Sequence, residues 1–175
     1  MGMTMNRKLG EFIREVDVRN RDLSVTLLLG VSNEKCFMPS IANIVGTDLS
    51  NYKIVRKNQF AFGTVTSRNG DKISIALLKE DECIVSSSYV VFEIIDTNEL
   101  DPDYLDMWFR REEFDRYTRF MSHGSVRELF SLDKMKEVEL PVPDIEIQRK
   151  YVNQYKTIDN AIRIKEQINN NLLHC

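Results

Sequence analysis

The stretch LPVPDIEIQRKYVNQYKTIDNAIRIKEQINNNLL, residues 140–173, decides how this chain is organised. Proline has no backbone N–H and is excluded from helix interiors, so Pro141 and Pro143 predict extended backbone and the end of a compact unit. Asp144 can cap a helix that follows it, and no glycine or proline interrupts residues 147–173. We therefore expect a globular domain over residues 1–143 and a long helix over residues 144–175.

The side-chain spacing along this helix predicts a coiled-coil seam. Two arrangements fit it: an amphipathic helix folded back on its own head, or an arm of roughly 40 Å that pairs with another helix. The polar residues Lys165 and Asn169 lie within the seam and favour the arm, because such residues fix register and partner. Steps of four and three residues run along the seam when Lys165 is included, and the candidate dimerisation residues are Tyr151, Tyr155, Ile158, Ile162, Asn169 and Leu172.

The preceding domain reads as α+β with a curved mixed β-sheet. Segments rich in Val, Ile, Phe, Tyr and Thr predict strands at residues 25–31, 54–55, 60–66, 73–78, 84–86 and 89–95. Asn69-Gly70-Asp71 predicts a hairpin turn. One helix is expected from the cap Asp101 to Gly124, with Phe120 on its apolar face, then a short helix over 132–136 and a strand over 138–140. The strand aromatics Phe60, Phe62, Tyr89 and Phe92 are expected in the core rather than as base-stacking platforms.

Composition excludes several classes of protein. Hydrophobic residues make up 42% of the chain, yet no apolar run approaches the ~18 residues of a membrane span. The three cysteines form no close pair in the sequence, and this pattern is typical of a protein in the reducing cytoplasm. The sequence contains no Gly-x-Gly loop and no metal-ligand spacing, so we expect no cofactor, no metal and no catalytic residue.

The order of several short motifs resembles a known family. These are Gly124 with Arg127, then Leu140-Pro141 with Pro143, then Gln148, then Ile158-Asp159 within the helix. Upstream, Lys8 to Ile13, Gly30-Val31-Ser32, Tyr52 to Val55 and Phe60-Ala61-Phe62 fit the same pattern. The chain resembles the DNA-specificity subunit of type I restriction-modification enzymes, over about residues 8 to 173, and corresponds to one target recognition domain with one conserved helix.

This resemblance implies a function without catalysis. The chain would read one half-site of a two-part target in double-stranded DNA, recruit methyltransferase subunits and, through them, the restriction subunit. Full-length members have two such domains and two helices that pair antiparallel, so this half is expected to form a homodimer through its helix.

Two segments are candidates for reading DNA. In the first, residues 66–72, arginine suits guanine, asparagine suits adenine, and lysine and serine suit phosphates; the alternative is a solvated hairpin tip. In the second, residues 119–127, a glycine turn brings serine and arginine together; the alternative is a helix end with a nearby cation. The candidate DNA contacts are Thr66, Ser67, Arg68, Asn69, Lys72, Arg119, Ser122, His123, Ser125 and Arg127.

The net charge of −3 keeps a second function open. A non-specific nucleic-acid coat would be basic, so DNA contacts would have to lie on one face of the protein. The alternative is a protein-interaction adaptor with a coiled-coil arm and no direct DNA binding. The two differ in salt dependence, because DNA affinity falls steeply with salt.

Overall fold

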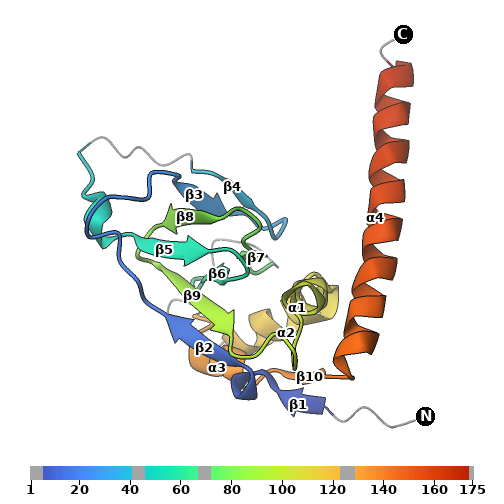
Figure 1. Cartoon of the computed structure of the whole chain (residues 1–175), viewed down its shortest axis with the longest axis horizontal. Coiled ribbons are helices and arrows are strands. Elements are labelled where there is room, and N and C mark those ends of the chain that lie inside the picture. The colour runs from blue at the N-terminus through green and yellow to red at the C-terminus, as the bar shows by residue number, and fades with distance from the viewer. Residues whose placement is uncertain (1–5, 41–45, 67–71, 123–128, 174–175) are drawn as a thin grey trace.

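The computed structural model describes residues 6–40, 46–66, 72–122 and 129–173. For residues 171–173 it describes the backbone only. It shows a head of short strands and helices and one long helix that leaves it (Figure 1). In chain order the elements are β1 (Asn6–Lys8), a 3-10 turn (Leu9–Glu11), β2 (Ile13–Val16), β3 (Leu29–Val31), β4 (Phe37–Pro39), a second 3-10 turn (Leu49–Asn51), β5 (Lys53–Arg56), β6 (Phe60–Gly63), β7 (Ile75–Leu77), β8 (Glu82–Val85), β9 (Tyr89–Ile94), α1 (Pro102–Phe109), α2 (Glu112–Ser122), α3 (Leu132–Lys136), β10 (Glu139–Pro141) and α4 (Ile145–Leu173).

The expected α+β class is confirmed, and its strands are shared among four small sheets. The largest has the order β2-β9-β6-β7, and the others are the pairs β1-β10, β3-β4 and β5-β8. Strand pairing within these sheets is antiparallel, and one isolated parallel bridge joins Leu28 to Ile84. The expected hairpin between residues 60 and 78 is present as the β6-β7 pair, while its turn at 69–71 lies outside the described residues.

The core forms because side chains alternate between the two faces of the four-stranded sheet. Phe60, Phe62 and Phe92 are fully buried on the face covered by α1 and α2, as the sequence predicted. The rings of Phe60 and Phe92 stack with centroids 5.0 Å apart, and Phe109 of α1 meets Phe60 edge-on at 5.5 Å. The intervening residues, such as Ala61, face the second cluster beneath β3, β5 and β8.

The single helix expected over residues 101–124 is wrong in two respects. Asp101 caps α1 as predicted, accepting from the N–H groups of residues 103 and 104, but the helix stops at Phe109 and restarts at Glu112. The carbonyl of Phe109 accepts a 2.6 Å hydrogen bond from Lys35 Nζ. In an uninterrupted helix this carbonyl would instead accept from the backbone N–H four residues later. Phe120, expected on the apolar face of the helix from its spacing, is 77% exposed.

The long helix α4 begins at Ile145, directly after the two prolines, and has 29 residues. The N–H groups of Ile147 and Gln148 donate to the carbonyl of Asp144 at 2.9 and 3.1 Å, which closes the first turn. Figure 1 shows α4 passing α1 near its base and then rising away from the head. Among the residues that the structure describes, no helix combines the length and the apolar character that crossing a membrane requires.

At its base, α4 follows a strand that pairs with the beginning of the described chain. β1 pairs with β10 in the register Arg7 to Leu140, and Lys8 Nζ lies 2.6 Å from Glu137 Oε2. The hydroxyl of Tyr104 donates to the carbonyl of Pro141 at 3.0 Å. These contacts hold the last strand before the arm against the head.

Candidate nucleic-acid interface

The start of the first candidate DNA-reading segment lies beside the backbone that follows the second. The N–H of Phe130 donates to the carbonyl of Thr64 at 2.8 Å, and Val65 forms an antiparallel bridge with Leu129. The end of β6, which leads into residues 67–71, therefore pairs with the backbone that follows residues 123–128. Val65 and Leu129, 64 positions apart in the sequence, thus lie side by side.

The described residues of the first segment lie at its two ends. Thr66 is buried, which leaves its side chain little surface to offer a ligand. Lys72 is half exposed and pairs with Glu34 at 3.1 Å, an exposed pair that DNA phosphates can displace at little cost. Ser67, Arg68 and Asn69 lie outside the described residues.

The second segment has one exposed and one buried described residue. Arg119 is exposed in the last turn of α2, where a cation is favoured by the helix dipole. Ser122 is buried and its hydroxyl donates to the carbonyl of Thr118 at 2.6 Å, so it stabilises the end of the helix. The remaining members, His123, Ser125 and Arg127, lie outside the described residues.

Lys134 is a positioning residue that the sequence reasoning missed. Its ammonium donates to the carbonyls of Met121 at 2.5 Å and Leu129 at 3.0 Å. Those two residues border the segment 123–128 on either side. A lysine shortly after a predicted helix end was the available signal, because such residues often bind the last helix carbonyls.

A buried ion pair stabilises the backbone that follows the first candidate segment. Asp115 Oδ1 accepts from Lys35 Nζ at 2.6 Å and from the N–H of Ile73 at 3.1 Å. Burial lowers the pKa of Lys35, while the bond to Asp115 opposes that shift and favours the charged form. Lys35 also has φ of +58°, a left-handed conformation that this packing must stabilise. The backbone between Lys72 and β7 is thereby fixed to α2.

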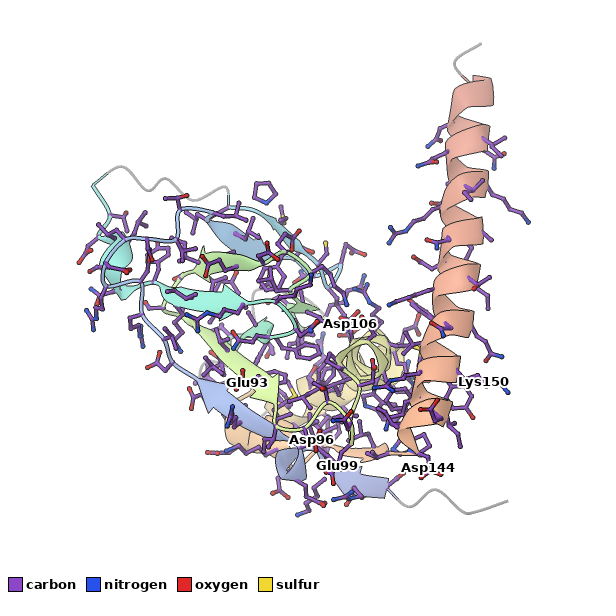
Figure 2. All side chains as sticks on the ribbon, in the orientation of Figure 1. Glu93, Asp96, Glu99, Asp106, Asp144 and Lys150 are labelled. Carbon is purple, nitrogen blue, oxygen red and sulfur yellow. The ribbon has the colours of Figure 1, made fainter. Side chains whose placement is uncertain are left out.

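A second anchored feature is the base of α4, where Gln148 is fully buried. Its Oε1 accepts from the N–H of Asp101 at 2.9 Å, and its Nε2 donates to the carbonyls of Glu99 at 2.8 Å and Pro143 at 2.7 Å. Figure 2 shows Glu99 and Asp144 close to the foot of the helix, with Lys150 on the side turned away from the head. One amide thus joins α4 to the cap of α1 and to the preceding loop.

About two turns after Gln148 along α4, a second contact joins this helix to α1. Asp103 of α1 lies between two lysines. Its carboxylate pairs with Lys156 of α4 at 2.6 Å and with Lys79, which follows β7. Burial would raise the pKa of Asp103, but the hydrogen bonds from the two lysines outweigh it and lower that pKa. Val152 of α4, only 6% exposed, packs into the main hydrophobic core of the head. The head therefore fixes the direction of the first turns of the arm.

The predicted seam is exposed along the arm. Tyr151 and Tyr155 are 48% and 40% exposed beside the head, and Ile158 and Ile162 are 62% and 50% exposed beyond it. Asn169 is exposed, and the side chain of Leu172 lies outside the described part. The sequence reasoning missed three further exposed apolar residues of α4, Ile147, Ile164 and Ile168. Apolar side chains are therefore exposed along the described length of α4.

Among the described residues, the potential for metal binding and the one buried cysteine bear on catalysis. These residues contain no group of three or more His, Cys, Asp or Glu side chains placed to bind a metal. Burial, together with nearby Glu80, raises the pKa of Cys83 to about 12, so its thiol stays protonated and unreactive at neutral pH. The geometry supports binding by loops on a rigid scaffold.

Comparison with known proteins agrees with this geometry. The family model of the type I restriction modification DNA specificity domain matches residues 16–174. A chain solved in work on complex assembly and conformational transition of the type I R-M system is similar, with a TM-score of 0.60 and 12% identity, over 93% of this chain and 40% of that one. The HsdS subunit from Thermoanaerobacter tengcongensis has a TM-score of 0.56 and 14% identity, over 91% of this chain and 38% of that subunit. This chain spans less than half the length of either, and at these identities the likeness concerns the fold. No curated protein matches the sequence.

Proposed function

The chain belongs to the type I restriction modification DNA specificity family, and we propose that it reads one half-site of a two-part DNA target. In this proposal residues 1–143 form the target recognition domain and residues 144–175 the helix that spaces and pairs two copies. The chain recruits methyltransferase subunits, and through them the restriction subunit, and has no catalytic role of its own.

The observation that supports DNA reading is the common origin of the two candidate loops. The first begins after Val65 and the second ends before Leu129, and these two residues pair. Lys35 and the N–H of Ile73, just after the first, share the carboxylate of Asp115, and Lys134 binds carbonyls on both sides of the second. Base readout needs a few side chains held at fixed positions relative to one another. Loops that share a rigid base meet that requirement.

The exposed seam supports the pairing of two copies. A two-fold dimer through α4 presents the same head to each half-site, so the two halves must be inverted repeats. With heads roughly 40 Å apart, the half-site centres lie about one turn of DNA apart, ~10–12 base pairs. Sequencing the methylome of cells that express this chain with its methyltransferase measures both properties.

The contacts to DNA are tested with Arg68→Ala and Arg127→Ala in the complex with the methyltransferase. Loss of a bidentate base contact weakens binding by about 1–3 kcal/mol and relaxes one position of the target, whereas loss of a phosphate contact weakens all sequences alike. Arg163→Ala, on the exposed part of α4, is the matched control. Unchanged DNA affinity in both loop variants contradicts the proposed reading surface.

The adaptor function remains the second candidate, because the net charge of −3 does not favour DNA. A titration of the complex with DNA at two salt concentrations separates the two. Sequence-dependent affinity that falls steeply with salt supports reading. Assembly with the methyltransferase in the absence of any contribution to DNA affinity supports the adaptor.

A further inference from the structure

The turn between β3 and β4 is joined to the helices of the head by a buried lysine. Lys35 lies in this turn, and only 6% of its side chain is exposed. Its ammonium donates to the carbonyl of Phe109 and to Asp115 Oδ1, both at 2.6 Å, and its own carbonyl accepts from Arg110 Nη2 at 2.9 Å. These contacts fix the turn to the junction of α1 and α2.

The same turn holds the end of the first candidate DNA-reading segment at two points. Glu34, which precedes Lys35 in the turn, pairs with the ammonium of Lys72 at 3.1 Å. Asp115, the partner of Lys35, accepts with the same Oδ1 from the N–H of Ile73 at 3.1 Å. Ile73 is fully buried, whereas half of the Lys72 side chain is exposed. A lysine that faces solvent therefore directly precedes a residue whose backbone is fixed in the interior.

Stability alone does not account for the pair of Lys35 and Asp115. Removing two charges from water has a desolvation cost that offsets much of their attraction, and apolar side chains of similar volume often stabilise a protein as well. The pair does supply a fixed geometry, because one carboxylate oxygen joins the β3–β4 turn to the N–H of Ile73. Phosphate contacts set the register of a protein on a DNA duplex, and they require side chains held in such a fixed relation.

We propose that Lys35 is a positioning residue for DNA binding, which acts through Asp115 to hold Lys72 where its ammonium contacts a phosphate of the DNA backbone. The ammonium of lysine is a compact charge with three rotatable donors, which suits a phosphate. The exposed bond to Glu34 yields to the phosphate at little cost, while the buried bonds keep the backbone beside Lys72 in place. The inference rests on the proposed function, since it names the residue that sets the geometry of one DNA contact.

The test is a double-mutant cycle in the complex with the methyltransferase subunit, with DNA affinity titrated at several salt concentrations. In the wild-type background, Lys72→Met weakens binding several-fold for all sequences alike and lowers the slope of log affinity against log salt by about 1. In the background Lys35→Met with Asp115→Leu, Lys72→Met has no further effect, because Lys72 is no longer held at the phosphate. Asp115→Asn, whose amide oxygen can still accept both hydrogen bonds, preserves the effect of Lys72→Met.

A matched control separates positioning from general destabilisation. Ile13→Ala removes a buried side chain from β2, at the edge of the four-stranded sheet opposite to β7, and leaves the effect of Lys72→Met intact. Arg110→Met is a milder variant that releases the carbonyl of Lys35 but keeps the buried pair, and it reduces the effect of Lys72→Met. This variant carries the test if the double variant does not fold, which thermal melting establishes.

Four outcomes overturn the proposal. If Lys72→Met weakens DNA binding equally in every background, Lys35 and Asp115 only stabilise the fold. If its effect is lost in the Ile13→Ala background as well, the loss follows from destabilisation. If Lys72→Met changes nothing in the wild-type background while Arg68→Ala or Arg127→Ala weakens binding, this inference is wrong and the proposed function stands. If none of these variants changes DNA affinity, the proposed reading surface and this inference fail together.

Discussion

Replacing Gln148 with alanine tests whether one buried amide holds the arm. The substitution removes three hydrogen bonds, to Asp101, Glu99 and Pro143. At a net contribution of about 1 kcal/mol each, their loss destabilises the protein by about 3 kcal/mol, and more if the backbone groups stay buried without partners. The better helix propensity of alanine offsets less than about 0.7 kcal/mol of this.

Urea unfolding followed by tryptophan fluorescence measures the effect, because the chain has a single tryptophan, Trp108. This residue lies on α1, which packs against α4. Gln154→Ala is the matched control, since Gln154 is exposed on the same helix. If Gln148→Ala and Gln154→Ala differ by less than about 1 kcal/mol, Gln148 does not anchor the arm by its hydrogen bonds.

A second variant, Gln148→Glu, adds a pH dependence with a defined sign. The carboxyl keeps an acceptor for the N–H of Asp101 but faces two carbonyl oxygens, and burial raises its pKa above the unfolded value. The folded state then binds more protons, so stability is highest below the unfolded pKa and is lost as pH rises through the folded one. Stability that increases with pH in this variant would contradict the assignment.

Three further predictions concern the arm and the buried charges. Ile158→Asp combined with Ile162→Asp places charge in the seam and yields monomers by light scattering; a dimeric double variant excludes α4 as the interface. Asp103→Asn costs about 1 kcal/mol at neutral pH. Because the pKa of Asp103 in the folded protein is lowered from its ordinary value of 3.8, its contribution to stability is fully present above pH 3.8 and is lost as pH falls below 3.8 through the folded-state pKa. Wild type and variant therefore converge in urea unfolding only below that folded-state pKa. Asp115→Ala leaves Lys35 buried and unpaired and costs about 3–5 kcal/mol by urea unfolding, whereas replacing both residues with apolar side chains costs less.

Local signals in the sequence were sufficient for several elements. Pro141 and Pro143 correctly marked the start of α4, Asp101 correctly marked the cap of α1, and the bounds of α3 matched those expected. Each depends on residues within one turn of the element. The strands β1, β2 and β4 were not predicted, because they are short and mostly exposed and so lack the apolar pattern of a core strand.

Contacts between distant residues account for what sequence reasoning missed. The break between α1 and α2 depends on Lys35, 74 positions before Phe109. The exposure of Phe120 follows from the turn of α2 after that break, which no local pattern encodes. For the candidate DNA surface, residue types suggested the two loops, but their common base depends on the pairing of Val65 with Leu129. The seam could be predicted because it depends on the spacing of residues within one helix. That spacing does not specify which helix would pair with it.

The pairing of β1 with β10 has a consequence for the order in which the chain acquires its structure. Lys8 and Glu137, which meet there, are 129 positions apart, so this contact closes one of the longest loops in the chain. Closing such a loop costs entropy that earlier, shorter-range contacts must first offset. During synthesis β1 is made first but can pair only after β10, the last strand of the described residues, has been made. The four-stranded sheet can therefore assemble before β1 and β10 pair at the base of α4. Additions that block residues 6–8 are therefore expected to disturb the direction of the arm rather than the folding of the core.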